Sequence, residues 1–301
     1  MLPKFNFGNY TFKGADQMKL IATDLDGTLL NENGEISTEN ATALKKAIDA
    51  GIQVIVATGR SYSAANKPLQ EAGVKCPIIC LNGANVYTES GDRLSNIPLS
   101  KTVSKKILHQ CQLNNTYFEL YTNQGVYSPD RAQFMDVLLN IMLSANPDVT
   151  REEVEERAAL RFQEEAFKTT DNFEGLLADE NIEIFKALAF SLEADTLEKV
   201  KTPFTDKDHV VITSSGFDNV EFNHPEAQKG IALSIFAAEK GIALKDTMAI
   251  GDNFNDLSML RIVGRGVAMG NAEKGIKEAC DYHTVTNNEH GVAKAIEAIL
   301  A

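Results

Sequence analysis

Two carboxylates stand two residues apart in the segment Asp24-Leu25-Asp26-Gly27-Thr28, directly after the apolar run 19–23. If that run is a β-strand, Asp24 and Asp26 point the same way, and Gly27 allows the chain to turn sharply. An aspartate nucleophile, a neighbouring acid or base and a hard, oxygen-ligated metal are the components of phosphoryl transfer through an aspartyl-phosphate. A solvated turn is the alternative interpretation, because Asp and Gly are common turn residues.

Three further apolar runs, 54–57, 77–81 and 248–250, also end in polar loops that contain glycine. Those loops are Thr58-Gly59-Arg60, Asn82-Gly83-Ala84 and Gly251-Asp252-Asn253-Phe254-Asn255-Asp256. Lys229 begins a helical stretch, where its ammonium adds to the positive end of the helix dipole. Because open parallel sheets bind ligands at the carboxyl ends of their strands, we expect these loops to meet around one site.

With these motifs in this order, the sequence resembles the haloacid dehalogenase-like (HAD) hydrolases of the Cof-type subclass IIB, a family of Mg²⁺-dependent phosphatases. The resemblance extends from Met18 to Leu300 and departs from the family pattern at no catalytic position. Two accessory motifs are also present, Asn82-Gly83-Ala84 and the pair Met269-Gly270-Asn271-Ala272 with His290-Gly291-Val292-Ala293.

The resemblance implies a role for each motif residue. Asp24 is expected to be the nucleophile and an Mg²⁺ ligand, and Asp26 the acid and base, with its backbone carbonyl on the metal. Asp252 is the third expected metal ligand, and Lys229 the cation that neutralises the phosphate. Asp256 is expected to orient Lys229 or a metal-bound water. The residues expected to bind phosphate or substrate are Leu25, Thr58, Gly59, Arg60, Asn82 and Asn255.

The elements that position these residues alternate between strand and helix. Strands separated by helices form a parallel sheet covered on both faces, so the sequence predicts an α/β fold with a Rossmann-like doubly wound parallel sheet. Helical spacing marks residues 39–50 and 61–72, and Gly51 and Gly73 follow them as C-terminal stops.

The pattern changes between residues 87 and 222 to an α+β insertion. Two hairpins are predicted there, 117–121 with 126–127, and 210–213 with 219–222 through Ser215-Gly216. The insertion resembles the type-2 cap of the Cof-like family, a lid over the active site. We therefore expect an N-terminal extension of residues 1–17, a core domain of residues 18–86 and 223–301, and a cap domain of residues 87–222.

The composition narrows the classes of partner. With 301 residues and 44% hydrophobic content, the chain can bury one or two cores. A net charge of −13 argues against nucleic acid, because binding to its backbone needs clustered Lys and Arg. No apolar run reaches membrane-spanning length, so no membrane partner is expected. The four cysteines, Cys76, Cys80, Cys111 and Cys280, lack metal-binding spacing and are expected to be buried, reduced thiols in the cytoplasm.

Three functions fit these motifs. A phosphatase acting on small phosphorylated metabolites is favoured, since nothing obvious in the chain would keep water from the phosphoenzyme. A sugar phosphomutase of the same fold and a non-catalytic phosphometabolite sensor are the alternatives. Relatives act on sugar phosphates, nucleotides, flavin mononucleotide or pyridoxal phosphate, and the cap residues considered for specificity are Tyr121, Arg131, Lys186 and His224. The sequence does not distinguish a monomer from a small homo-oligomer.

Overall fold

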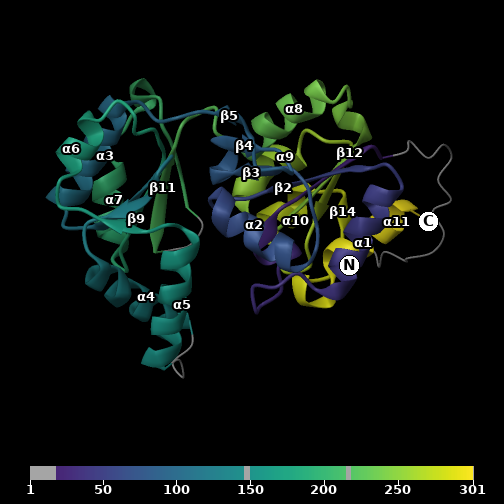
Figure 1. The fold of residues 1–301 in the computed structure, drawn as a ribbon, viewed down its shortest axis with the longest axis horizontal. Coiled ribbons are helices and arrows are strands. Elements are labelled where there is room, and N and C mark those ends of the chain that lie inside the picture. The colour runs from purple at the N-terminus through teal and green to yellow at the C-terminus, as the bar shows by residue number, and fades with distance from the viewer. Residues whose placement is uncertain (1–17, 146–149, 215–217, 301) are drawn as a thin grey trace, which may run out of the picture.

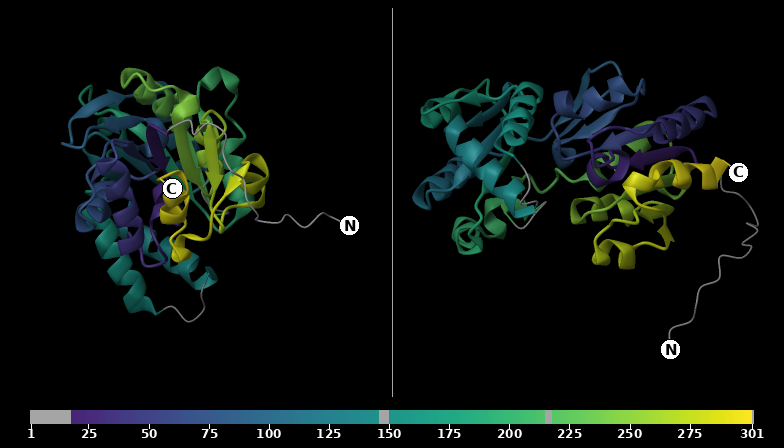
Figure 2. Two further views of the ribbon diagram at one scale, coloured as in Figure 1. Left: turned by 90° about the vertical axis from the view of Figure 1, so that its right-hand side faces the viewer. Right: turned by 90° about the horizontal axis from the view of Figure 1, so that it is seen from below.

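The computed structural model describes residues 18–145, 150–214 and 218–300, and within them the chain forms two bodies. Each body is built on its own β-sheet, and the two lie side by side (Figure 1). Figure 2 shows the same arrangement from two further directions. The expected extension, residues 1–17, and the expected turn Ser215-Gly216 lie outside the described residues.

The core body contains an eight-stranded sheet in the order β14-β13-β12-β1-β2-β3-β4-β5. Its strands are β1 (Leu20–Thr23), β2 (Gln53–Ala57), β3 (Ile78–Cys80), β4 (Asn85–Tyr87), β5 (Arg93–Asn96), β12 (Thr247–Gly251), β13 (Arg265–Ala268) and β14 (Tyr282–His283). The strands from β14 to β3 pair in parallel, whereas β4 and β5 pair antiparallel. The predicted Rossmann-like parallel sheet is confirmed.

The strand order reverses between β1 and β12. From β1 the chain adds β2 and β3 on one side, whereas β13 and β14 extend the sheet on the other side of β12. Right-handed connections then place the intervening helices on opposite faces of the sheet. The helices of the core are α1 (Thr38–Asp49), α2 (Tyr62–Glu71), α8 (Lys229–Glu239), α9 (Leu257–Leu260), α10 (Lys274–Ala279) and α11 (Gly291–Leu300). Ligands bind outside the carboxyl ends of the strands at such a reversal point.

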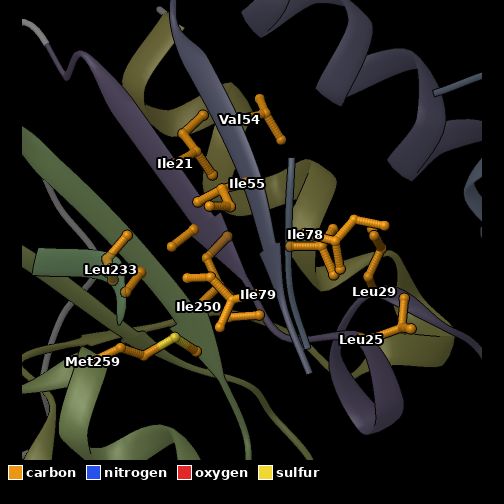
Figure 3. Packing of buried hydrophobic residues seen from close by; sticks show 14 of the residues in the cluster. Ile21, Leu25, Leu29, Val54, Ile55, Ile78, Ile79, Leu233, Ile250 and Met259 are labelled. Carbon is orange, nitrogen blue, oxygen red and sulfur yellow. The ribbon is translucent and has the colours of Figure 1, made fainter. Parts of the chain in front are cut away.

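Apolar side chains fix the sheet in this position. Ile21, Ile55 and Ile250 come from three neighbouring strands and are fully buried, while Leu233 and Met259 pack against the sheet from α8 and α9 (Figure 3). Each such side chain contributes about 1.5–3 kcal/mol relative to an exposed one. The strand ends, and therefore the loops that follow them, rest on a rigid base.

The cap body contains a six-stranded sheet in the order β10-β11-β9-β6-β7-β8. Its strands are β6 (Tyr117–Thr122), β7 (Gly125–Ser128), β8 (Lys168–Thr169), β9 (Ile184–Phe190), β10 (Val211–Thr213) and β11 (Asn219–Asn223). Its helices are α3 (Lys101–Leu113), α4 (Arg131–Ala145), α5 (Arg151–Glu164), α6 (Phe173–Ala178) and α7 (Ala194–Lys201). Both predicted hairpins, β6 with β7 and β10 with β11, are confirmed as antiparallel pairs.

The sheet pairing bears on where the insertion begins, which the sequence predicts at residue 87. Strand β4 ends at Tyr87, and β5 then extends the core sheet by pairing with β4. The chain therefore leaves the core only after Asn96, and it re-enters the core after β11. We propose a boundary between Asn96 and α3 in place of the one expected at residue 87, because residues 88–96 complete a core hairpin.

Two further observations concern the chain as a whole. All four cysteines are buried and unpaired, as predicted. Among the helices of the described residues, none combines the length and the apolar character needed to span a membrane.

Candidate active site

Asp24 and Asp252 meet because their strands are neighbours in the core sheet. Asp24 directly follows β1 and Asp252 directly follows β12, and the Asp24 backbone amide donates a hydrogen bond to the Ile250 carbonyl at 2.9 Å. The turn Leu25–Leu29 then folds back over Asp252, with Gly27 at a φ of +72°. A Cβ atom on Gly27 would collide with the Asp252 carboxylate. Glycine is therefore required both for the backbone conformation and for this close approach.

Asp256 adds a third carboxylate to the pair. Carboxylate oxygens of Asp24, Asp252 and Asp256 all lie within 4.8 Å of one another. The Thr28 hydroxyl donates to Asp252 at 2.9 Å. Asp256 Oδ2 accepts the backbone amides of Asp252 and Asn253 at 3.0 and 3.1 Å. Asp256 is fully buried, so these amide bonds hold the loop around the acidic cluster.

Lys229 supplies the positive charge that contacts this cluster. Its Nζ donates to Asp24 Oδ1 at 2.6 Å and to Asp256 Oδ1 at 2.7 Å, and its side chain has no exposed surface. Burial disfavours the ammonium, but the two carboxylates outweigh this effect and hold the Lys229 pKa above its usual value. Lys229 is therefore a fixed cation at the first residue of α8.

The negative charge of the three carboxylates still exceeds the single positive charge of Lys229, which contacts them. Burial, followed by the charge of Asp256, raises the pKa of Asp24 well above its usual range, although Lys229 opposes the shift. The same two causes raise the pKa of Asp252 to about 6. A cluster in which two acids resist ionisation is short of positive charge.

The donor set fits a hard divalent cation. Asp24, Asp252 and Asp256 offer only oxygen ligands, which is the set that Mg²⁺ prefers. Asp256 already uses both carboxylate oxygens, for Lys229 and for two amides, so it is better placed to support the cluster than to bind the ion. The carboxylate of Asp26 lies outside this cluster.

Asp26 is held by Arg60. Arg60 Nε donates to Asp26 Oδ2 at 2.9 Å, and Arg60 Nη2 donates to Asp26 Oδ1 at 2.6 Å. Arg60 comes from the loop after β2, whose backbone is fixed because the Arg60 amide donates to Thr58 Oγ1 at 3.1 Å. The general acid or base expected from the sequence is thus paired with a guanidinium that the sequence places in the substrate-binding set.

Asn82 and Asn255 join the third and fourth loops. Asn255 Nδ2 donates to Asn82 Oδ1 at 3.3 Å, and Asn82 Nδ2 donates to Glu221 of the cap at 2.9 Å. Asn82 has a positive φ of 58°, an uncommon backbone conformation for a residue other than glycine. Asn255 Oδ1 is buried and has no hydrogen-bond partner among the described residues. That oxygen is available for a bound group.

A cavity of about 490 Å³ opens between the core and the cap. Core residues on its wall include Asp24, Asp26, Gly59, Arg60 and Asn255, and the cap contributes Tyr121, Leu160, Arg161, Glu165, Lys186, Leu188 and Glu221. Lys186 Nζ donates to the Gly59 carbonyl at 3.2 Å and lies 3.6 Å from Glu221 Oε1. The cap therefore closes over the acidic cluster through direct polar contacts.

The structure brings most of the expected site residues together. Lys229, Thr58 and Asp256 are buried behind the cavity wall, and Asp252 lies beside Asp24, with carboxylate oxygens of the two within 4.8 Å. The side chain of Leu25 is buried in the core instead (Figure 3). Of the cap candidates, Tyr121 and Lys186 line the cavity, whereas His224 accepts a backbone hydrogen bond from Glu226 away from it. The side chain of Arg131 lies outside what the structure describes.

Sequence reasoning missed Arg161, Glu165 and Glu221. Glu221 alternates with Val220 and Phe222 along β11, and this alternation alone would assign Glu221 to a solvent-facing side of the strand. Arg161 and Glu165 occur in a stretch rich in charged residues, where local pattern does not separate them from solvent-facing neighbours.

Comparison with known proteins agrees with this geometry. The profile of the haloacid dehalogenase-like hydrolases matches residues 21–296. Phosphatase YwpJ of Bacillus subtilis is 36% identical over 285 residues, covering 94% of this chain and 100% of that protein. The 5-amino-6-(5-phospho-D-ribitylamino)uracil phosphatase YwtE of Bacillus subtilis is 35% identical, covering 94% and 99%.

A solved structure extends the agreement to the fold. A haloacid dehalogenase-like hydrolase from B. subtilis has a TM-score of 0.83 and 36% identity, covering 93% of this chain and 99% of that one. The shared fold and the phosphatases among the relatives identify the chain as an enzyme, a phosphoric monoester hydrolase. It belongs to the haloacid dehalogenase-like hydrolase family.

Proposed function

We propose that this protein is a Mg²⁺-dependent phosphatase that hydrolyses small phosphorylated metabolites through an aspartyl-phosphate on Asp24. One observation carries the proposal. Asp24 lines the cavity, and its Oδ1 accepts a hydrogen bond from Lys229 Nζ at 2.6 Å. Its carboxylate also lies beside those of Asp252 and Asp256. A fixed nucleophile, a buried cation and a cluster able to take a divalent ion are the parts that phosphoryl transfer to an aspartate requires.

Asp24, Asp252 and the backbone carbonyl of Asp26 are the groups proposed to hold Mg²⁺. When bound, the ion supplies the positive charge that lets a phosphate dianion approach these carboxylates. Lys229 adds its own charge next to the nucleophile, and Asp256 orients Lys229. This division of roles agrees with the occupied oxygens of Asp256.

The phosphate is proposed to lie against the loops after β1, β2 and β12. Backbone amides of Leu25 and Gly59, the hydroxyl of Thr58 and the amide of Asn255 are its proposed partners. The positions of Gly59 and Asn255 on the cavity wall support this assignment. Asn82 is then a positioning residue, because its Oδ1 accepts from Asn255.

Asp26 is proposed as the acid and base. In the first step a bond forms between an Asp24 oxygen and phosphorus, the ester P–O bond breaks, and Asp26 gives a proton to the leaving oxygen. In the second step Asp26 accepts a proton from water as that water attacks phosphorus, which frees Asp24 and inorganic phosphate. The guanidinium of Arg60 must leave Asp26 during this cycle, and the phosphate is its proposed new partner.

The proposed substrates are sugar phosphates, nucleotides or phosphorylated cofactors. The relative YwtE, named for 5-amino-6-(5-phospho-D-ribitylamino)uracil, adds that compound to the candidates. The buried, unpaired cysteines support a reducing, cytoplasmic location.

The test is release of inorganic phosphate from a panel of these compounds, with Mg²⁺ and with EDTA. Asp24→Asn should abolish release. Asp246→Asn is the matched control, because Asp246 precedes β12 at the opposite end of the same strand and pairs with Lys19. If the substrate is isomerised and no phosphate is released, the protein is a mutase and the proposal is wrong. If the compounds bind without turnover, the protein is a sensor.

A further inference from the structure

One carboxylate on the cap side of the cavity has no role in the proposed chemistry. Glu165 directly follows α5, lines the cavity and is only 7% exposed. Its Oε2 is buried without a hydrogen-bond partner among the described residues. A carboxylate oxygen in this situation loses its hydration without replacement, which costs stability unless a ligand restores the missing bond.

The surroundings hold Glu165 in this costly position. Burial raises the pKa of Glu165, and the Ser61 hydroxyl and the charge of Arg161 offset that effect only in part. The carboxylate also lies at the C-terminal end of α5, where the helix dipole is negative. The next residue, Ala166, has a positive φ of 48°, and its carbonyl packs so closely against Gly125 that a Cβ there would collide. Glu165 is therefore fixed in place by its backbone.

Arg161 lies one helical turn before Glu165 and also lines the cavity. Its Nη2 donates to Glu119 Oε2 at 2.6 Å and to the Tyr121 hydroxyl at 3.0 Å. The Nε and Nη1 atoms have no hydrogen-bond partner within the described part of the chain, and the side chain is 27% exposed. One helix thus presents an unused acceptor and unused donors to the same cavity.

The cavity wall has few aromatic side chains against which a planar ring of a ligand could stack. Tyr121 is the one aromatic residue on the described wall, and Lys186 Nζ lies 4.4 Å from the centre of its ring. Its hydroxyl is already bonded to Glu119 at 3.1 Å and to Arg161. The apolar part of the wall is aliphatic, from Ala64, Leu160 and Leu188. No stacking platform for a base or a flavin is present among these residues.

We propose that Glu165 and Arg161 form a receptor for hydroxyl groups of the leaving group, which makes sugar phosphates and polyol phosphates the preferred substrates. The inference rests on the proposed function and deepens it. A hydroxyl both donates and accepts, so neighbouring hydroxyls satisfy Glu165 Oε2 and the free N–H groups of Arg161 together. On the cap wall, Glu165 and Glu221 balance Arg161 and Lys186, which favours an uncharged leaving group.

Two substrates of equal carbon number test the receptor. Ribitol 5-phosphate carries the hydroxyls and n-pentyl phosphate lacks them. The ratio of their kcat/KM values measures hydroxyl recognition apart from phosphoryl transfer, and in the wild-type enzyme it should favour ribitol 5-phosphate. Glu165→Gln should lower that ratio about tenfold to a hundredfold, the loss expected when a hydrogen bond to a charged group is removed. Glu156→Gln, an exposed position on the same helix, should leave the ratio unchanged.

A binding measurement separates the receptor from turnover. In the Asp24→Asn background, calorimetry should give ribitol 5-phosphate a weaker Kd by a similar factor when Glu165→Gln is added. If the wild-type enzyme hydrolyses both esters and Glu165→Gln leaves their ratio intact, the receptor is refuted while the phosphatase stands. If no phosphate ester in the panel is hydrolysed, the phosphatase itself fails and the receptor fails with it.

Discussion

Arg60 donates hydrogen bonds to both carboxylate oxygens of Asp26, from Nε to Oδ2 at 2.9 Å and from Nη2 to Oδ1 at 2.6 Å. A bidentate, charge-assisted pair of this kind is stronger than hydrogen bonds between neutral groups. An acid whose two oxygens both accept from a guanidinium cannot offer a proton to a leaving group. We therefore expect Arg60 to exchange Asp26 for the phosphate when substrate binds, which would couple substrate binding to release of the proposed acid.

Replacing Arg60 tests this exchange. Arg60→Gln should raise KM about tenfold or more, because it removes a charged hydrogen bond to the phosphate. The value of kcat should fall less, since Asp26 remains. Steady-state kinetics on the best substrate of the panel give both values. Lys19→Gln, which breaks the ion pair with Asp246, is the control cation removal outside the cavity. An unchanged KM in Arg60→Gln would contradict the exchange.

Asp26→Asn should lower kcat and leave substrate binding intact. Loss of a general acid and base lowers turnover by about 10²–10⁴-fold. Binding should persist, because Arg60 then lacks its carboxylate partner and can pair with the phosphate instead. We expect a large fall in kcat together with a Kd for substrate equal to or below that of Asp24→Asn. Retention of full kcat would remove Asp26 from the mechanism.

Mg²⁺ should stabilise the folded protein even when no substrate is present. The carboxylates of Asp24, Asp252 and Asp256 lie close together in the fold and separate on unfolding, so an ion held by Asp24 and Asp252 would bind the native state. At a concentration 100 times its Kd the gain is about 2.7 kcal/mol. Thermal unfolding in Mg²⁺ and in EDTA measures it. Asp252→Asn should abolish most of the difference, whereas Asp246→Asn should retain it.

Gly27→Ala should damage the same site through the backbone. Gly27 and Gly34 both adopt positive φ values, 72° and 76°, so alanine is strained at either position. That strain alone costs about 1–2 kcal/mol. A Cβ at Gly34 meets nothing within 4 Å, whereas one at Gly27 collides with Asp252. Gly27→Ala should therefore also lose the stabilisation by Mg²⁺, and Gly34→Ala should keep it. Equal responses to Mg²⁺ would show that Asp252 moves aside without loss.

The core of the site could be predicted because strand ends converge. Lys229 and Asp24 are far apart in sequence, yet both belong to elements whose ends meet at the reversal point of a parallel sheet. Apolar runs marked β1, β2, β3 and β12, and the polar loop after each carried the chemistry. The geometry follows from topology, and the periodicity of the sequence encodes that topology.

The cap contacts could not be predicted in the same way. Glu221 reaches Asn82, and Lys186 reaches the Gly59 carbonyl, across a boundary between two separately folded sheets. Local periodicity carries no information on how two such bodies dock. The hairpin partner β5 was also missed, because Arg93–Asn96 is short, polar and half exposed, without the alternation that marks a strand.

The stability of the cap should depend on pH through Glu165. Burial raises its pKa above the value of about 4.3 expected in the unfolded chain. The charged groups that act on it are Arg161 and Lys186, which favour its ionised form, and Glu119, which opposes it. As the pH rises above the unfolded value, the unfolded chain loses the Glu165 proton first, so the folded state becomes relatively less stable. The loss is complete once the pH exceeds the folded pKa.

Glu165→Gln should remove this penalty. At pH 7.5 the variant should resist urea unfolding more than the wild type, and the difference should shrink as the pH is lowered towards 4.5. Glu156→Gln, with an exposed side chain, should show no such trend. Urea titrations at several pH values give the free energy of unfolding for each protein. A variant that is less stable than the wild type at pH 7.5 would mean that the ionised Glu165 is already satisfied without a ligand. If Glu165→Gln gains stability at neutral pH and also loses its selectivity for ribitol 5-phosphate, Glu165 lowers the stability of the fold in exchange for substrate recognition. A residue that serves only folding would not show this opposition between stability and selectivity.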